Sequence, residues 1–182
     1  MDSFQEFSNK VINHERKKRE VVIGLFGSFK RDELRQLRDA LLAENYNVRI
    51  SSDLESEIHP KPGMSADAYN YELSIALIEQ CDIHIFLFHR ELKGEHNINQ
   101  SASMELQYLA TRNNNQNVLV LLEDGYIKQS RGVFKGLKSN TSGKWRWRTY
   151  RHFETLKDAA VKFSFSRILS FSHSDNSLKG KA

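Results

Sequence analysis

Three runs of almost entirely apolar residues constrain the fold of this chain more than any other feature. They cover residues 21–26, 83–88 and 118–122 and are rich in β-branched and aromatic side chains. Runs of this kind are typical of strands that are buried on both faces, as in a parallel sheet covered by helices. Between them, apolar residues recur at helical spacing over residues 31–45, 66–80 and 101–112. The alternation predicts an α/β domain with a parallel sheet.

Weaker patterns complete this architecture. Residues 46–51 and 145–150 alternate as strands do, and residues 152–166 carry apolar positions at helical spacing. We therefore expect a flavodoxin-like three-layer sandwich with a mostly parallel five-stranded sheet and right-handed crossovers. The polar segments 52–65 and 126–143 are expected to be loops. The predicted organisation is an amphipathic helix and basic linker over residues 1–19, an α/β domain over residues 20–170, and a disordered polar tail over residues 171–182.

Composition narrows the classes of function. The 182 residues carry a formal net charge of +4, which suits a small phosphate-bearing ligand as well as a nucleic acid. Cys81 is the single cysteine of the sequence, so neither an internal disulfide nor a cysteine-based metal cluster can form. No apolar run approaches the ~20 residues that span a bilayer. We expect a cytoplasmic protein without membrane contact.

Polar residues follow three of the predicted strands, at the edge of the sheet where open α/β folds bind ligands. Gly27, Ser28 and Phe29 follow the first apolar run, residues 97–105 lie beyond the second, and residues 123–125 end the third. A glycine lets the backbone approach a ligand closely, and a hydroxyl offers a hydrogen bond to ribose or phosphate. An ordinary strand-to-helix turn in which Ser28 caps the helix explains the first loop equally well.

Glu105 is the candidate catalytic residue. A glutamate early in a helix is commonly the partner of a capping serine three residues earlier, but that position is Ala102, which cannot cap. Asn99 and Ser101 remain as caps without such a partner. Capping therefore leaves Glu105 unexplained, and a functional acid is the interpretation we carry forward.

Other chemistries have weaker support. The spacing of His89 and His96 matches no strong metal-binding pattern, so no metal site is predicted. The glycine-flanked serine of an α/β-hydrolase and the Walker loop are both missing from the sequence. Trp145 and Trp147 alternate with basic residues and could stack on bases, but the same pattern is typical of an edge strand with tryptophan inward and arginine outward. Nucleic acid is therefore not the expected partner.

Three short motifs resemble those of nucleoside 2-deoxyribosyltransferases and related nucleotide N-glycosidases. They are residues 24–29 (GLFGSF), residues 78–83 (IEQCDI) and residues 103–108 (SMELQY), within a resemblance that covers roughly residues 20–125. The resemblance implies that Glu105 is a nucleophile that attacks the anomeric carbon of a nucleoside, nucleotide or NAD, with no cofactor. The substrate-binding residues that it implies are Gly27, Ser28, Phe29, Asn99, Ser101 and Ser103.

The chain departs from the family pattern at two kinds of position. Ser103 and Gln107 stand where the family has glycines, and the acid that the family carries in the helix before the third strand has no clean match. Ser74 falls near that place, with Glu72 and Asp67 as substitutes. A neighbouring subunit of a homo-oligomer often completes the site in this family.

Two alternatives stay open. The chain also resembles Toll/interleukin-receptor-like domains, which cleave the N-glycosidic bond of NAD with a glutamate at a comparable place. The alternative from another class is a non-catalytic nucleotide-sensing module of a prokaryotic signalling or antiviral defence system, which binds its ligand at the same edge of the sheet.

Overall fold

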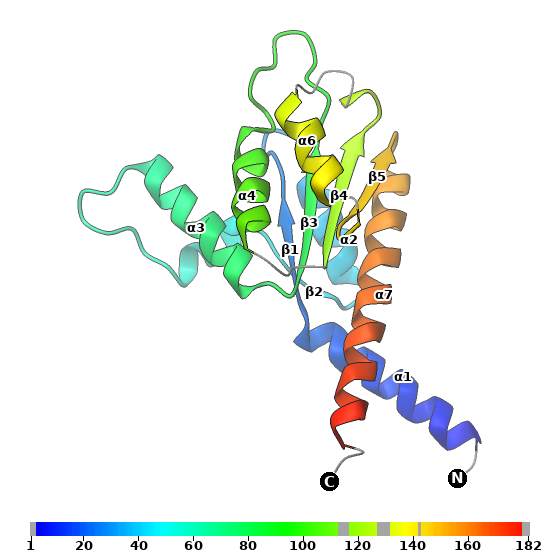
Figure 1. Cartoon of the computed structure of the whole chain (residues 1–182). Helices are drawn as coiled ribbons and strands as arrows, with labels where there is room; N and C mark the ends of the chain where they lie inside the picture. The colour runs from blue at the N-terminus through cyan, green and yellow to red at the C-terminus, as the bar shows by residue number, and fades with distance from the viewer. Residues whose placement is uncertain (1–2, 113–116, 127–131, 142, 180–182) are drawn as a thin grey trace.

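The chain folds around a five-stranded parallel sheet, seen in a computed structural model that describes residues 3–112, 117–126, 132–141 and 143–179 (Figure 1). The strands run in the order β2-β1-β3-β4-β5, and all four pairings are parallel. Their bounds are Val22–Phe26 (β1), Asn47–Arg49 (β2), Ile83–Phe88 (β3), Val118–Glu123 (β4) and Arg146–Tyr150 (β5). This is the flavodoxin-like order, and the predicted fold class is confirmed, with every strand parallel.

Helices cover both faces of the sheet. One layer contains α2 (Glu33–Ala43) and α7 (Phe153–Lys179), and the other contains α3 (Ala66–Gln80), α4 (Gln100–Thr111) and α6 (Gly132–Thr141) (Figure 1). Side chains that alternate along a strand point to opposite faces, so each buried strand contributes to both layers. In β3, Ile85 packs with the α2 and α7 side, whereas Phe86 packs with the α3 and α4 side. Two cores therefore hold the sheet between them.

Local signals explain where the helices begin and end. The Ser65 hydroxyl caps α3 by accepting a hydrogen bond from the Ala68 N–H at 3.2 Å. After α2, Asn45 adopts a left-handed backbone with φ of 64°. Asparagine tolerates this conformation better than most residues, and it ends a helix by turning the chain. The turn leads directly into β2.

The structure differs from the sequence-based expectations in three segments. Residues 126–143, expected to be a loop, contain the helix α6, and the polar segment after β2 begins with a short 3-10 helix, η1 (Ser51–Ser56). Helix α7 continues to Lys179, past residue 171, where a disordered tail was expected. Up to residue 171 the helix packs against the core beside α2, where Ile168 is fully buried and Phe171 partly buried.

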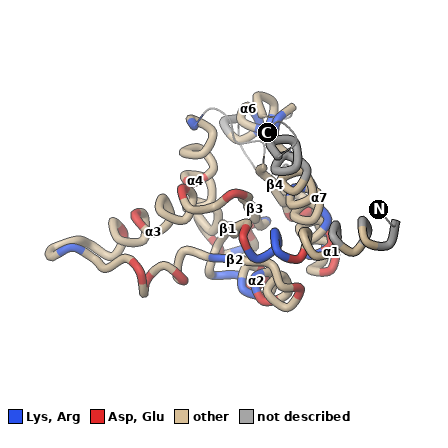
Figure 2. Tube along the Cα trace, turned by 90° about the horizontal axis from the view of Figure 1, so that it is seen from below, with Lys and Arg blue, Asp and Glu red and all other residues tan. Residues whose placement is uncertain are grey.

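One helix and one loop extend away from the sheet. Helix α1 (Ser3–Glu20) contacts α7 and projects from the body with the chain's N-terminus, and the loop before α3 projects from the other side (Figure 1). Acidic residues recur along η1 and α3, whereas Lys61 lies in the projecting loop (Figure 2). None of the described helices has the length and apolar composition needed to cross a membrane.

Candidate functional site

The loop after β1 is tightly built. A Cβ atom added to Gly27 would lie 3.2 Å from the Leu87 Cβ atom, so glycine allows β1 and β3 to approach each other here. Ser28 is buried, and its hydroxyl accepts a hydrogen bond from the Lys30 N–H at 3.2 Å. Ser28 therefore stabilises the turn itself and does not cap α2, whose N-cap residue is Asp32. Phe29 is exposed and lies 5.6 Å from the Arg35 guanidinium.

Asn99 joins the end of β3 to the start of α4. Its side-chain carbonyl accepts from the His89 N–H at 2.8 Å, and its amide donates to the His89 carbonyl at 2.6 Å. Asn99 is the N-cap residue of α4, but its side chain makes no capping bond. It is buried, and both of these hydrogen bonds hold the backbone that leaves the strand.

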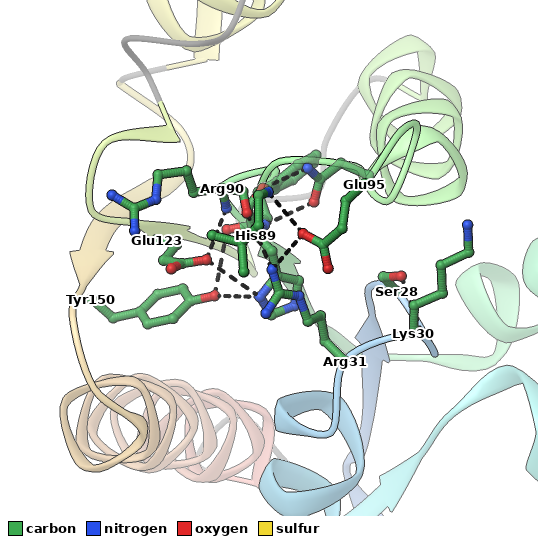
Figure 3. A network of polar contacts seen from close by, with 11 residues as sticks. Ser28, Lys30, Arg31, His89, Arg90, Glu95, Glu123 and Tyr150 are labelled. Atoms are coloured by element: carbon green, nitrogen blue, oxygen red, sulfur yellow. Dashed lines mark hydrogen bonds and ion pairs between the residues drawn. The ribbon is translucent and has the colours of Figure 1, made fainter.

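His89 is the centre of a buried polar network at the carboxyl edge of the sheet (Figure 3). Its Nδ1 atom lies 2.9 Å from the Tyr150 hydroxyl and 3.9 Å from Glu123 Oε2, while its Nε2 atom is buried without a partner. Burial lowers the pKa of His89, and the acids Glu33 and Glu123 oppose that shift. The imidazole is therefore held neutral, with Tyr150 and the backbone fixing its position.

Hydrogen bonds also hold the loop after His89 to the loop after β1 and to the end of β4. Arg31 donates to Glu95 at 2.7 Å, and the same carboxylate oxygen accepts from the Leu92 N–H at 2.8 Å. On the other side, the Arg90 N–H donates to Glu123 at 2.8 Å. These contacts bring together residues that follow β1, β3 and β4, as the sequence predicts for the carboxyl edge of a parallel sheet.

A pocket opens beside this loop. Its volume is about 460 Å³, within the range of small-molecule sites, and its walls are Glu91, Asn97, Asn99, Gln100, Ser103, Met104 and Tyr126. Asn97 has a left-handed backbone with φ of 58°, and Ser103 donates to the Asn99 carbonyl at 2.8 Å. Amides, hydroxyls and one carboxylate form the polar part of this wall, so it suits an uncharged hydrogen-bonding ligand better than a phosphate.

Glu105 lies on another face of α4. Successive helical residues are about 100° apart, so Glu105 and Ser103 are about 200° apart around the helix. The Glu105 side chain is buried with the apolar face of α4, and the Ser74 hydroxyl of α3 is bonded to its carboxyl group. Its Oε2 atom has no hydrogen-bond partner. Burial raises the pKa of Glu105 to about 7, against the opposing effect of Ser74.

This carboxyl group can take part in acid–base or nucleophilic chemistry at neutral pH. With a pKa of about 7, its ionised and protonated forms are both well populated there. A buried carboxylate with an unpartnered oxygen is costly for stability, which is why such groups are candidates for function. Ser74, which the sequence comparison placed near the position of the family's second acid, is the residue that contacts Glu105.

The predicted site residues fall into separate groups. Asn99 and Ser103 line the pocket, Glu105 contacts Ser74 away from the pocket wall, and Ser101 is exposed at the start of α4. Sequence analysis did not identify Tyr126 or Glu91 as pocket residues, nor His89 as the centre of a network. The position of His89 directly after a buried strand was the available signal for the network.

No family model matches the chain. Among curated proteins, none shows significant sequence similarity to it. The chain is similar in structure to a 2-deoxyribosyltransferase from the psychrotolerant bacterium Bacillus psychrosaccharolyticus, with a TM-score of 0.47 and 10% sequence identity, covering 75% of this chain and 90% of that chain. The function must therefore be inferred from the side chains of this chain.

Proposed function

We propose that this protein cleaves the N-glycosidic bond of a nucleoside, nucleotide or NAD, with Glu105 as the nucleophile. The observation that carries the proposal is the state of the Glu105 carboxyl group, which is buried, has one unpartnered oxygen and has a pKa raised to about 7. Glu105 belongs to α4, the helix that follows β3, and α/β folds bind ligands near the carboxyl ends of their strands. The resemblance of residues 103–108 to the nucleophile segment of nucleoside 2-deoxyribosyltransferases supports the same role.

The proposed reaction has two steps. In the first, ionised Glu105 forms a bond from its unpartnered oxygen to the anomeric carbon while the carbon–nitrogen bond breaks, and the base leaves with the bonding electrons and takes a proton from solvent. In the second, water or another base displaces the carboxylate and releases the sugar. Ser74 holds the second carboxyl oxygen and orients the group. Gly27 and Ser28, with Ser101, are the proposed contacts of the sugar or phosphate.

The pocket beside Tyr126 favours a second candidate, a non-catalytic sensor of nucleosides or nucleotides. Its wall includes Asn99 and Ser103 but not Glu105. A ligand there would exchange hydrogen bonds with the amide side chains, donate a hydrogen bond to the Glu91 carboxylate and stack on Tyr126. Such a module would bind without turnover.

One experiment separates the two candidates. The protein is incubated with nucleosides, nucleotides and NAD, free base is measured by chromatography, and thermal unfolding is followed with each compound. The Glu105→Gln variant tests the nucleophile, and Glu91→Gln, which changes the pocket by the same substitution, is the matched control. We expect base release from the wild type and from Glu91→Gln, and none from Glu105→Gln.

Two other outcomes would contradict the proposal, the first for the role of Glu105 and the second for the enzymatic activity itself. If Glu105→Gln releases base as fast as the wild type, Glu105 is not the nucleophile. If the wild type is stabilised by a compound without releasing base, and Glu91→Gln loses that stabilisation, the pocket is a sensor site.

A further inference from the structure

Arginines from two elements meet at the open edge of the sheet. β5 is an edge strand, and Arg146 and Arg148 are exposed at alternate positions along it. Alternate residues share a face, and Tyr150, two residues beyond Arg148, packs into the core on the α7 side. Helix α7 lies beside this strand (Figure 1) and contributes Arg167, whose guanidinium lies 5.2 Å from the centre of the Phe163 ring. Arg146 and Arg148 therefore lie on the side of β5 that α7 covers, and Arg167 lies on that helix.

The charges of these three arginines are not neutralised by the described part of the protein. No ion pair between described residues includes Arg146, Arg148 or Arg167, whereas other arginines are paired, as in Arg31–Glu95 and Arg38–Asp53, both at 2.7 Å. The Nε atom of Arg167 is buried and has no hydrogen-bond partner. A buried donor without an acceptor is rare in native proteins, so it calls for an explanation.

Arg146 and Arg167 are close enough to repel each other. Burial lowers the pKa of the Arg167 guanidinium, and the positive charge of Arg146 lowers it further. Arginine remains protonated in proteins, so the arrangement holds two positive charges together rather than losing one. An anion placed between them would remove the repulsion and accept the unused Nε–H bond.

Protection of the sheet edge explains only part of this arrangement. Charged side chains on an edge strand discourage pairing with another chain, and Arg146 and Arg148 fit that role. Arg167 does not, because it comes from α7 and is half-buried over an aromatic ring. A second guanidinium in that position increases repulsion without covering the backbone of β5.

We propose that Arg146, Arg148 and Arg167 form a phosphate-binding site between β5 and α7. The planar guanidinium group matches the geometry of phosphate oxygens and binds them through paired, charge-assisted hydrogen bonds. Arg146 pairs with Leu119 near the start of β4, so the site lies toward the amino end of the sheet. The polar pocket follows the carboxyl end of β3, and Glu105 lies between α4 and α3 on the other face of the sheet, so the proposal is independent of the proposed reaction. The phosphate group belongs to free phosphate, to a nucleotide or to a nucleic acid backbone.

The test measures binding at constant ionic strength, with chloride as the balancing anion. Isothermal titration and thermal unfolding are carried out with inorganic phosphate, with AMP and its phosphate-free counterpart adenosine, and with a short single-stranded oligonucleotide. Binding of phosphate and AMP identifies a small phosphate ligand, and salt-dependent binding of the oligonucleotide alone identifies a nucleic acid backbone. If none of the phosphate-bearing probes binds more tightly than chloride, the proposal is wrong.

Variants assign the binding to these arginines. Arg167→Met keeps an apolar side chain over Phe163 and removes the positive charge of α7. Arg146→Met removes the positive charge of β5. We expect each to weaken phosphate binding about tenfold or more, the loss expected for one charge-assisted hydrogen bond. Arg19→Met removes an equal charge from an exposed position on α1 and should leave binding unchanged.

Two further readouts keep the proposal falsifiable if a core variant folds poorly. Arg148→Met changes an exposed side chain and should also weaken binding. In the wild type, the NMR signal of the Arg167 Nε–H group should move when phosphate is added, because that donor acquires an acceptor. An unchanged Arg167 signal, or equal binding by Arg148→Met and Arg19→Met, would overturn the proposal.

Discussion

At the scale of single residues, the Glu105 carboxyl group is the costliest feature of the proposed active site. Folding raises the pKa of Glu105 from the usual 4.5 to about 7. At pH values above both, the buried charge therefore lowers the unfolding free energy by about 3 kcal/mol. The folded state binds the proton more tightly than the unfolded state. The stabilisation that comes from this tighter proton binding is fully present below pH 4.5 and is lost as the pH rises through 7.

Glu105→Gln should therefore stabilise the protein in a pH-dependent way. Glutamine has nearly the same shape and carries no charge, so the variant should match the wild type near pH 4 and exceed it by up to about 3 kcal/mol at pH 8. Urea unfolding across this pH range measures the difference. The exposed Glu79→Gln, which loses a surface ion pair with Arg112 but keeps an oxygen that can accept from the Tyr108 hydroxyl, should show no such gain. A pH-independent effect of Glu105→Gln would show that the carboxyl group is not desolvated.

At the scale of elements, the attachment of α4 to β3 depends on Asn99. Replacing Asn99 by alanine leaves the N–H and carbonyl groups of His89 without partners in a buried position. We expect a loss of about 2–4 kcal/mol of unfolding free energy, because each unsatisfied buried group costs 1–3 kcal/mol. Faster hydrogen exchange at the His89 amide should accompany it. Gln100→Ala, one residue further along and exposed, is the control and should cost little.

Sequence reasoning predicts elements well where a periodic apolar pattern decides the structure. The strand over residues 83–88 and the helix over residues 66–80 have the predicted bounds, because their side chains face a core in a regular way. Helix α6 was missed because Gly136 and neighbouring polar residues lower helix propensity, while Phe134 and Leu137 pack against the core on the α3 and α4 side. Tertiary packing, rather than local propensity, makes that segment helical.

The candidate site was only partly predictable for a related reason. The position of Glu105 after β3 follows from its place in the sequence, but its burial depends on how α3 packs against α4. The partners of His89 illustrate the same limit, since Tyr150 lies 61 residues away in sequence and reaches it only across the sheet. Such contacts are set by the order of strands, which a sequence pattern alone does not determine.

At the scale of the whole molecule, α1 is attached to the α/β body in two places, through its contact with α7 and through its last turn. Lys18 lies 4.9 Å from the centre of the Tyr46 ring, and the Arg19 carbonyl accepts from the Asn47 side chain at 3.1 Å. Before that turn, the buried His14 ring packs edge-to-face on Phe165 of α7, with 4.6 Å between the ring centres.

Two truncations should therefore have different effects. A chain that begins at Glu15 loses the buried His14 ring that packs against α7, so we expect its unfolding free energy to fall by about 1 kcal/mol. A chain that begins at Val21 also loses the cation–π contact at Tyr46 and the hydrogen bond to Asn47, so we expect a further loss of about 1–2 kcal/mol. Urea midpoints at constant m-value measure both. If the shorter deletion costs as much as the longer one, the contact of α1 with α7 contributes more to stability than its last turn does.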